Sequence, residues 1–179
     1  KKIHRGDYPD PALSSPLARP DLGVKEGMWL TAVDGKPLVR GEDYLQRLAN
    51  RASTEVELSI NTSARLEGSR RVVVKPVGND GMIRYATWVR ETREYVTKRS
   101  NGQIGYIHLY DMGGLGLRQF ARDYPGQWNK KGMIIDDRWN HGGFVANMLI
   151  AHLDRKLFAV GTSRQGGTWP RPGNCFTGH

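Results

Sequence analysis

The segment of the chain that is richest in possible chemistry is a glycine turn that follows an apolar run. Residues 134–143 read Ile-Ile-Asp-Asp-Arg-Trp-Asn-His-Gly-Gly, and an apolar helical pattern begins directly after them. A strand that runs through such a turn into a helix presents unpaired backbone N–H groups at the positive end of the helix dipole. Such groups bind a phosphate, a carboxylate or a developing oxyanion, and glycine lets the ligand approach the backbone.

The same residues also fit a plain strand-to-helix turn, in which glycine is needed only for its dihedral angles. The run is not a nucleotide-binding loop of the Walker type, because no Gly-Lys-Ser or Gly-Lys-Thr follows it. It is not a dinucleotide-binding fingerprint either, since the third glycine of that motif is missing. Spacing alone therefore leaves an anion site and a structural turn both open.

Candidate nucleophiles are few and poorly placed. Ser163 is the only serine after the glycine turn, it lies in a segment without periodicity, and no Gly-x-Ser-x-Gly motif occurs. Cys175 and His179 are four residues apart and could pair on a helix, but Pro172 and Gly173 argue against a helix there. We therefore expect the chain to contain no nucleophile.

The histidines give no sign of a metal site. His108 alternates with the apolar Ile107 and Leu109, as a hydrogen-bonded strand histidine does, and this fits better than a catalytic base. His152 falls within a predicted helix and is expected to pack there or to lie on the surface. Because no His-x-x-x-His or flanking carboxylate pattern occurs, we predict no metal ion and no cofactor.

Composition limits the class of molecule. The chain has 179 residues, 27 of them basic and 18 acidic, which gives a net charge of +9 and suits one domain or two small ones. The basic excess is spread in pairs such as Arg70-Arg71 and Lys98-Arg99 without interleaved aromatic residues, so no nucleic-acid partner is predicted. No stretch approaches the ~18 apolar residues of a membrane span, and a single cysteine makes no internal disulfide.

The first 78 residues predict a small β-rich domain with a helix. Apolar residues alternate with polar ones in the strands, and Asp34-Gly35 is a strong tight-turn signal. Residues 2–7 look like the end of a strand, and a proline-rich loop follows them. The expected elements are strands at 27–33, 56–60 and 72–74 and a helix at 42–51.

Residues 79–179 predict an α/β layer, because helical and strand patterns alternate. The run Met133-Ile134-Ile135 is continuous and apolar, as in a covered strand of a parallel sheet. The tail from Gly161 onward is rich in glycine and proline and shows no periodicity. The expected elements are helices at 83–98, 115–124 and 144–158 and strands at 104–109 and 133–136.

These motifs resemble a known family. Residues 105–112 and 134–143 look like the core of the tail-specific (C-terminal processing) serine peptidases, family S41, and are most similar to its tricorn protease branch. Residues 15–20 and 24–38 resemble the PDZ domain of these proteases. The resemblance implies a PDZ-like domain over 1–78, followed over 79–179 by part of an α/β peptidase core with a parallel-type sheet flanked by helices.

The resemblance also implies chemistry. Serine peptidases attack the scissile carbonyl with a serine, and backbone N–H groups hold the oxyanion. Carried over by position, the oxyanion hole would include Gly142, with Gly143 beside it, while Asp136 and Arg138 would support the turn. His141 stands where the family usually has a small residue or proline.

The serine and the catalytic histidine of the tricorn branch would lie outside these residues, so we expect an interior fragment that is inactive alone. The PDZ-like unit would bind an extended peptide along the helix at 42–51, through Tyr44, Leu45 and Leu48. For Leu45 and Leu48, a place in the small domain's core fits the pattern better than a place in the peptide groove. The alternative function is a non-catalytic, PDZ-type peptide-binding scaffold.

Peptides are the expected partners of either function. The resemblance implies a parent protein that forms a homo-oligomer and is cytoplasmic, with export to the periplasm as the alternative.

Overall fold

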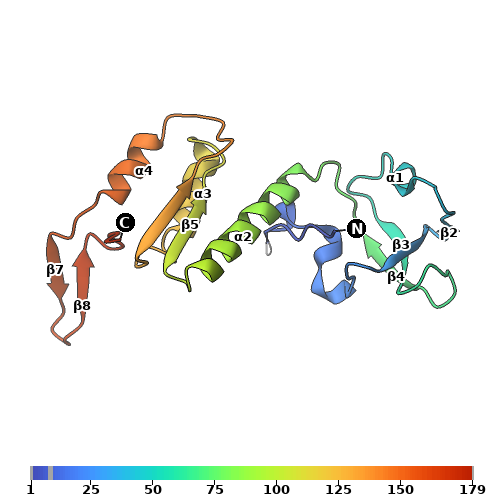
Figure 1. Ribbon diagram of the computed structural model, residues 1–179, viewed down its shortest axis with the longest axis horizontal. Coiled ribbons are helices and arrows are strands. Elements are labelled where there is room, and N and C mark those ends of the chain that lie inside the picture. The colour runs from blue at the N-terminus through green and yellow to red at the C-terminus, as the bar shows by residue number, and fades with distance from the viewer. Residues whose placement is uncertain (1, 8–9, 179) are drawn as a thin grey trace. The chain divides into compact units, whose positions relative to one another are not determined.

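The computed structural model describes residues 2–7 and 10–178, and it divides the chain into two compact units. Unit 1 covers residues 1–90 and unit 2 covers residues 91–179. The division falls inside helix α2 (Gly81–Arg99), which continues from one unit into the other (Figure 1). The domain boundary after residue 78 stays a prediction.

Unit 1 is built on a four-stranded antiparallel sheet in the order β2-β1-β3-β4. Asp34 and Gly35 have φ angles of 47° and 73°, so the predicted tight turn between β1 and β2 is confirmed. The strands are β1 (Trp29–Val33), β2 (Lys36–Pro37), β3 (Val56–Asn61) and β4 (Arg70–Val74).

The alternating apolar residues of these strands form the core of unit 1. Its buried members are Val33, Val56, Leu58, Ile60, Val72 and Val74. Three short 3₁₀ turns precede the sheet, and the leucines of the second and third, Leu17 and Leu22, pack against this core. The turns are η1 (Pro11–Leu13), η2 (Pro16–Ala18) and η3 (Pro20–Leu22). Upstream, the expected strand end is a single bridge, Gly6 to Ser14.

Helix α1 (Tyr44–Arg47) is much shorter than the predicted helix at 42–51. Its start is capped by the Asp43 side chain, which accepts from Leu45 N at 3.0 Å. At its end, Leu48 N donates to Leu45 O at 3.0 Å, a bond between residues three apart rather than four. Asn50 then adopts a left-handed φ of 59°. The left-handed residue stops the helix, a local effect that apolar periodicity does not reveal.

Unit 2 contains a parallel pair of strands, with helix α3 packed against them, which confirms the expected parallel-type sheet. Ile104 lies opposite Gly132 and His108 opposite Asp136, with no shift in register between them. The buried core joins the strand end to the helices through Ile107, Leu109, Phe120, Tyr124 and Leu149. The elements are β5 (Ile104–His108), α3 (Gly114–Asp123), β6 (Gly132–Asp136) and α4 (Ala146–Leu153).

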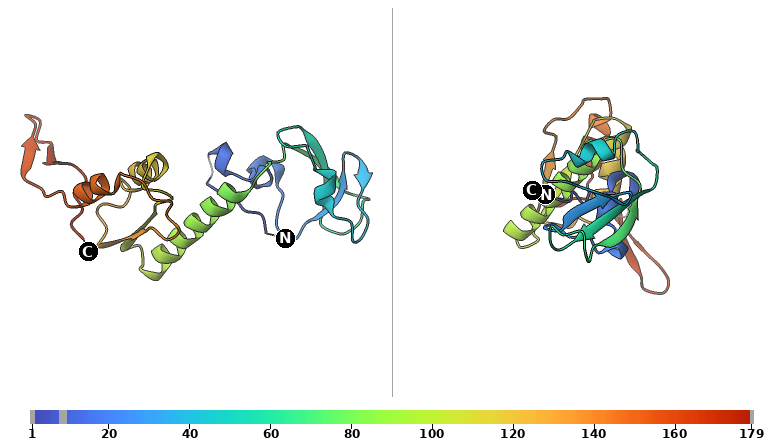
Figure 2. Two further views of the ribbon diagram at one scale, coloured as in Figure 1. Left: turned by 90° about the horizontal axis from the view of Figure 1, so that it is seen from above. Right: turned by 90° about the vertical axis from the view of Figure 1, so that its right-hand side faces the viewer.

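Three predictions about unit 2 are wrong in detail. The helix predicted at 144–158 is α4, which starts later because Val145 N still donates to Met112 O at 2.9 Å. The tail is not unpatterned: β7 (Ala159–Thr162) and β8 (Thr168–Arg171) form an antiparallel hairpin (Figure 2). Nor is β6 fully covered, since Ile134 remains 45% exposed.

Within the described residues, no helix combines the length and the apolar character that crossing a bilayer requires.

His152 of α4 is packed in an apolar setting that does not suit a charge. Its ring meets Phe120 and Tyr124 edge-on, with centroid distances of 5.4 and 4.8 Å. The Nε2 atom is buried and has no hydrogen-bond partner in the described part of the chain. Burial lowers the pKa of His152 below its ordinary value, and the nearby positive charge of Arg155 lowers it further.

We predict that acid weakens unit 2 through His152. The pKa of His152 is lower in the folded than in the unfolded chain. Its contribution to the free energy of unfolding is therefore fully present above the unfolded pKa of about 6.5 and is lost as the pH drops through that value. Urea unfolding at pH 8 and pH 5.5 should show a smaller loss for His152→Phe, which keeps an edge-on ring but cannot titrate. Equal losses for the variant and the wild type would contradict this.

Candidate functional site

The carboxyl ends of β5 and β6 meet at one edge of the parallel sheet, and the glycine turn grows from that edge. Leu109 N donates to Asp136 O at 2.9 Å, so the pairing continues past the strand ends. Ligands of parallel α/β sheets bind at this edge, beyond the carboxyl ends of the strands. The turn predicted from the sequence therefore lies where such a fold places its chemistry.

Asp136 anchors the start of the turn. Its buried carboxylate accepts from Tyr106 Oη at 2.6 Å, from Arg138 Nε at 2.9 Å and from Arg138 N at 3.1 Å. The Arg138 guanidinium holds the pKa of Asp136 well below its usual range, while burial and the Asp136 contact raise the pKa of Tyr106. The cluster fixes where the chain leaves β6, which is the supporting position expected for Asp136 and Arg138.

The turn then pairs with residues 109–112, which directly follow β5. We call residues 109–112 the template segment. Asn140 Nδ2 donates to Leu109 O at 2.9 Å, and His141 N donates to Tyr110 O at 3.1 Å. Met112 N donates to Gly142 O at 2.8 Å. These bonds, together with the one from Val145 to Met112, set the backbone of the turn on both sides of its glycines.

The two glycine amides differ in what they can offer a ligand. Gly142 N donates to Asn140 Oδ1 at 2.7 Å, so it is already used within the turn. Gly143 N has no acceptor among the described residues, and Gly143 is exposed. Of the two amides, the Gly143 N–H is therefore the one that could donate to a ligand without breaking a bond inside the turn.

Gly143 also requires the absence of a side chain. Its φ is +140°, and an added Cβ would lie 2.1 Å from Met112 O, a backbone atom. Gly142 has a φ of +76°, but an added Cβ there would meet no atom within 4 Å. Of the two glycines of the turn, Gly143 is therefore the one at which the close approach of the template segment excludes a side chain.

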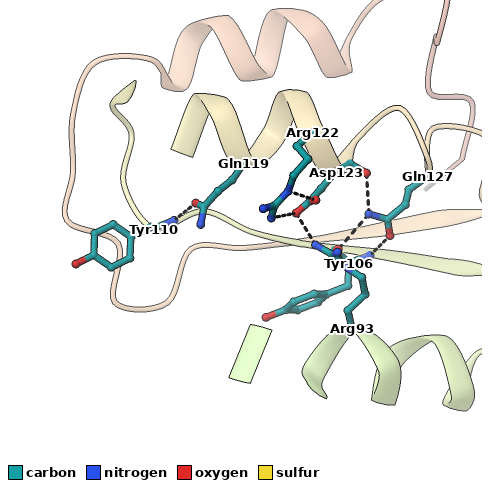
Figure 3. Close-up of polar contacts among 7 residues, drawn as sticks. All are labelled: Arg93, Tyr106, Tyr110, Gln119, Arg122, Asp123 and Gln127. Carbon is teal, nitrogen blue, oxygen red and sulfur yellow. Dashed lines mark hydrogen bonds and ion pairs between the residues drawn. The ribbon is translucent and has the colours of Figure 1, made fainter. Parts of the chain in front are cut away.

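Helix α3 holds the template segment in place. Tyr110 N donates to Gln119 Oε1 at 2.9 Å (Figure 3), and Asp111 Oδ1 accepts from Gly113 N and Gly116 N at 2.9 and 2.7 Å. The Tyr110 ring also lies 4.6 Å from the His141 ring. His141 thus contacts Tyr110 through both its backbone and its ring.

A second group of side chains secures β5 itself (Figure 3). Gln127 accepts from Tyr106 N at 2.8 Å and donates to Tyr106 O at 3.2 Å, so a side chain covers the strand edge that faces away from β6. Arg93 Nε donates to the same Tyr106 O at 3.2 Å. Buried Asp123 pairs with both Arg93 and Arg122. No sequence spacing indicates the contacts of Arg93 and Gln127, because Arg93 lies 13 residues from Tyr106 and 30 from Asp123, and Gln127 lies 21 residues from Tyr106.

The residues considered for a catalytic triad have other partners. Ser163 Oγ accepts from Gly167 N at 3.0 Å in the hairpin turn, and the buried Cys175 thiol donates to Pro172 O at 3.2 Å. His108 is buried, with Nε2 at 2.9 Å from Arg138 O. His179 lies outside the described residues. Among residues 2–7 and 10–178, no cluster of three metal-ligating side chains occurs.

The residues considered for peptide binding in unit 1 are divided between surface and core. Leu45 is 56% exposed on α1, and Tyr44 is half-buried beside it. Leu48, which follows the helix, packs against the buried core of unit 1. The structure thus leaves Leu45 available to a ligand and gives Leu48 a packing role.

Comparison with known proteins agrees with both units. Residues 1–79 match the family model of the tricorn protease PDZ domain. The chain is 33% identical over 178 residues to the tricorn protease of Thermoplasma acidophilum, covering 99% of this chain and 16% of that protein. It is 38% identical over 167 residues to a putative tricorn protease homolog 2 of Streptomyces coelicolor, covering 92% of this chain and 14% of that protein.

A crystal structure of the tricorn protease superposes on the chain with a TM-score of 0.84 at 32% identity, covering 99% of this chain and 17% of that one. The chain thus spans about one-sixth of the length of these relatives. Its fold is that of a PDZ domain followed by a mixed α/β unit with a parallel sheet and flanking helices. The chain is thus similar to tricorn proteases over almost all of its own length, and its first 79 residues match their PDZ domain.

We predict a sharp difference between alanine at the two glycines. Gly142→Ala should cost about 1–2 kcal/mol, the penalty of a left-handed alanine in open space. Gly143→Ala should cost about 3 kcal/mol or more, because strain and a backbone collision add together. Urea unfolding of both variants measures the difference. Similar losses would show that the template segment does not approach Gly143 as closely as described.

Proposed function

We propose that this chain is part of a tricorn-like serine peptidase that hydrolyses unfolded or short peptides. In this proposal unit 2 supplies an oxyanion donor, and unit 1 supplies a PDZ domain that binds substrate. The observation that supports it most directly is the exposed Gly143 amide, which has no acceptor among the described residues at the carboxyl edge of the parallel sheet. A donor held by fixed backbone needs little reorganisation when the oxyanion forms.

The assignment of the donor follows from the hydrogen bonds of the turn. Gly142 N is bound by Asn140, so Gly143 carries the proposed function and Gly142 shapes the loop. The nucleophilic serine and its histidine base come from polypeptide outside these 179 residues, and the chain alone is inactive. Peptides are the substrates, and the parent protein is a homo-oligomer.

We expect the nucleophile to be found outside this segment. A full-length protein that contains these residues should hydrolyse an unblocked fluorogenic peptide, while the 179-residue chain should show no turnover. A fluorophosphonate probe reacts with activated serines, so peptide mapping of the labelled full-length protein should find the adduct outside residues 1–179. Labelling of Ser163, or hydrolysis by the isolated chain, would contradict the proposal.

The alternative is a peptide-binding scaffold without catalysis, and the PDZ domain of unit 1 favours it equally. In both functions an extended peptide would lie beside α1, contacting Tyr44 and the exposed Leu45. Leu48 packs against the core of unit 1, which is the alternative place that the sequence pattern predicts for it. An active full-length enzyme decides against the pure scaffold.

Two leucine variants test the peptide site. Leu45→Ser should change stability by no more than about 0.5 kcal/mol, because the side chain is exposed, but should weaken peptide binding several-fold. Leu48→Ser should destabilise unit 1 by about 2–3 kcal/mol, because it removes packing from the core. Fluorescence polarisation with a labelled peptide ending in an apolar residue, paired with thermal unfolding, separates the two effects. Unchanged binding by Leu45→Ser would place the peptide elsewhere.

A further inference from the structure

The direction of the Gly143 amide depends on the template segment. Residues on both sides of Gly143 are hydrogen-bonded to the template segment. His141 N donates to Tyr110 O at 3.1 Å, Gly142 O accepts from Met112 N at 2.8 Å, and Val145 N donates to Met112 O at 2.9 Å. A shift of residues 109–112 would therefore move the amide with it. The contacts that fix the position of the template segment therefore also fix the direction of the Gly143 N–H, the proposed oxyanion donor.

Tyr110 is the residue of the template segment that is hydrogen-bonded both to the glycine turn and to helix α3. Its carbonyl oxygen accepts from His141, while its N–H donates to Gln119 Oε1 on α3 at 2.9 Å (Figure 3). Its ring also lies against the His141 ring. One residue thus receives a hydrogen bond from the turn and gives one to a helix.

The bond to Gln119 is partly buried, so its loss would not be neutral. A buried amide that loses its acceptor carries a desolvation penalty, and the backbone relieves it by turning toward water. Such a turn at Tyr110 changes the position of its carbonyl and therefore of His141. Displacements near 1 Å at a reacting group lower rates by roughly 100-fold.

We propose that Gln119 is a positioning residue for the oxyanion donor and acts on Gly143 through Tyr110 and His141. This inference rests on the proposed peptidase function and adds a residue that touches neither substrate nor reacting atoms. Glutamate offers the same acceptor atom at the same reach, whereas leucine offers none. The neighbouring Arg118 is exposed on α3 and provides a matched control.

The kinetic test uses the full-length protein. Gln119→Leu should lower kcat roughly 10- to 100-fold with KM within about twofold, because an oxyanion donor acts on the transition state rather than on bound substrate. Gln119→Glu should restore most of kcat, and Arg118→Gln should match the wild type. An active wild type in which Gln119→Leu keeps its kcat, or loses only KM, would overturn the proposal.

A second test does not need activity. In the full-length protein, Gln119→Leu should speed amide hydrogen exchange at His141 and Gly142 roughly tenfold, while Arg118→Gln should not. Equal acceleration throughout unit 2 would show a general loss of stability, and unchanged exchange would show no coupling; either would overturn the proposal. If the full-length wild type is inactive, the peptidase function fails, and the exchange result alone decides whether Gln119 positions the turn.

Discussion

The backbone pairing between residues 109–112 and 140–145 is the interaction on which the proposed site depends. It continues the parallel pairing of β5 and β6 past the buried strand ends, so the glycine turn is held as an extension of the sheet rather than as a free loop. The pairing uses the amides of His141 and Val145 and the carbonyl of Gly142, while Asn140 uses the Gly142 amide. The Gly143 amide has no acceptor among the described residues, and Gly143 is exposed.

Much of the fold could be predicted from the sequence. Alternating apolar residues marked the strands of unit 1, the Asp34-Gly35 pair marked their turn, and the apolar run at 133–135 marked a parallel strand. The errors occur where hydrogen bonds override periodicity. Helix α4 starts late because Val145 is still paired with Met112, and the β7–β8 hairpin contains Gly161 and Pro170, which propensity alone does not assign to strands.

The sequence indicates which segment forms the candidate site, but it does not indicate which backbone amide of that segment is available to a ligand. The glycine pair after an apolar run indicated an anion-binding turn, yet the sequence did not distinguish Gly142 from Gly143. That distinction comes from the Asn140 side chain and from the close approach of Met112 O to Gly143. The glutamines that hold β5 and the template segment carry no local signal, because their partners lie 9 and 21 residues away along the chain.

A structure of the full-length protein in covalent complex with a peptide aldehyde tests the central claim most directly. The aldehyde forms a tetrahedral adduct with an active serine, and its oxygen takes the place of the oxyanion. We predict that this oxygen lies about 2.7–3.1 Å from Gly143 N, with Gly142 N still bound to Asn140. An adduct oxygen held by other groups, with Gly143 N turned away or bonded within the protein, would contradict the account.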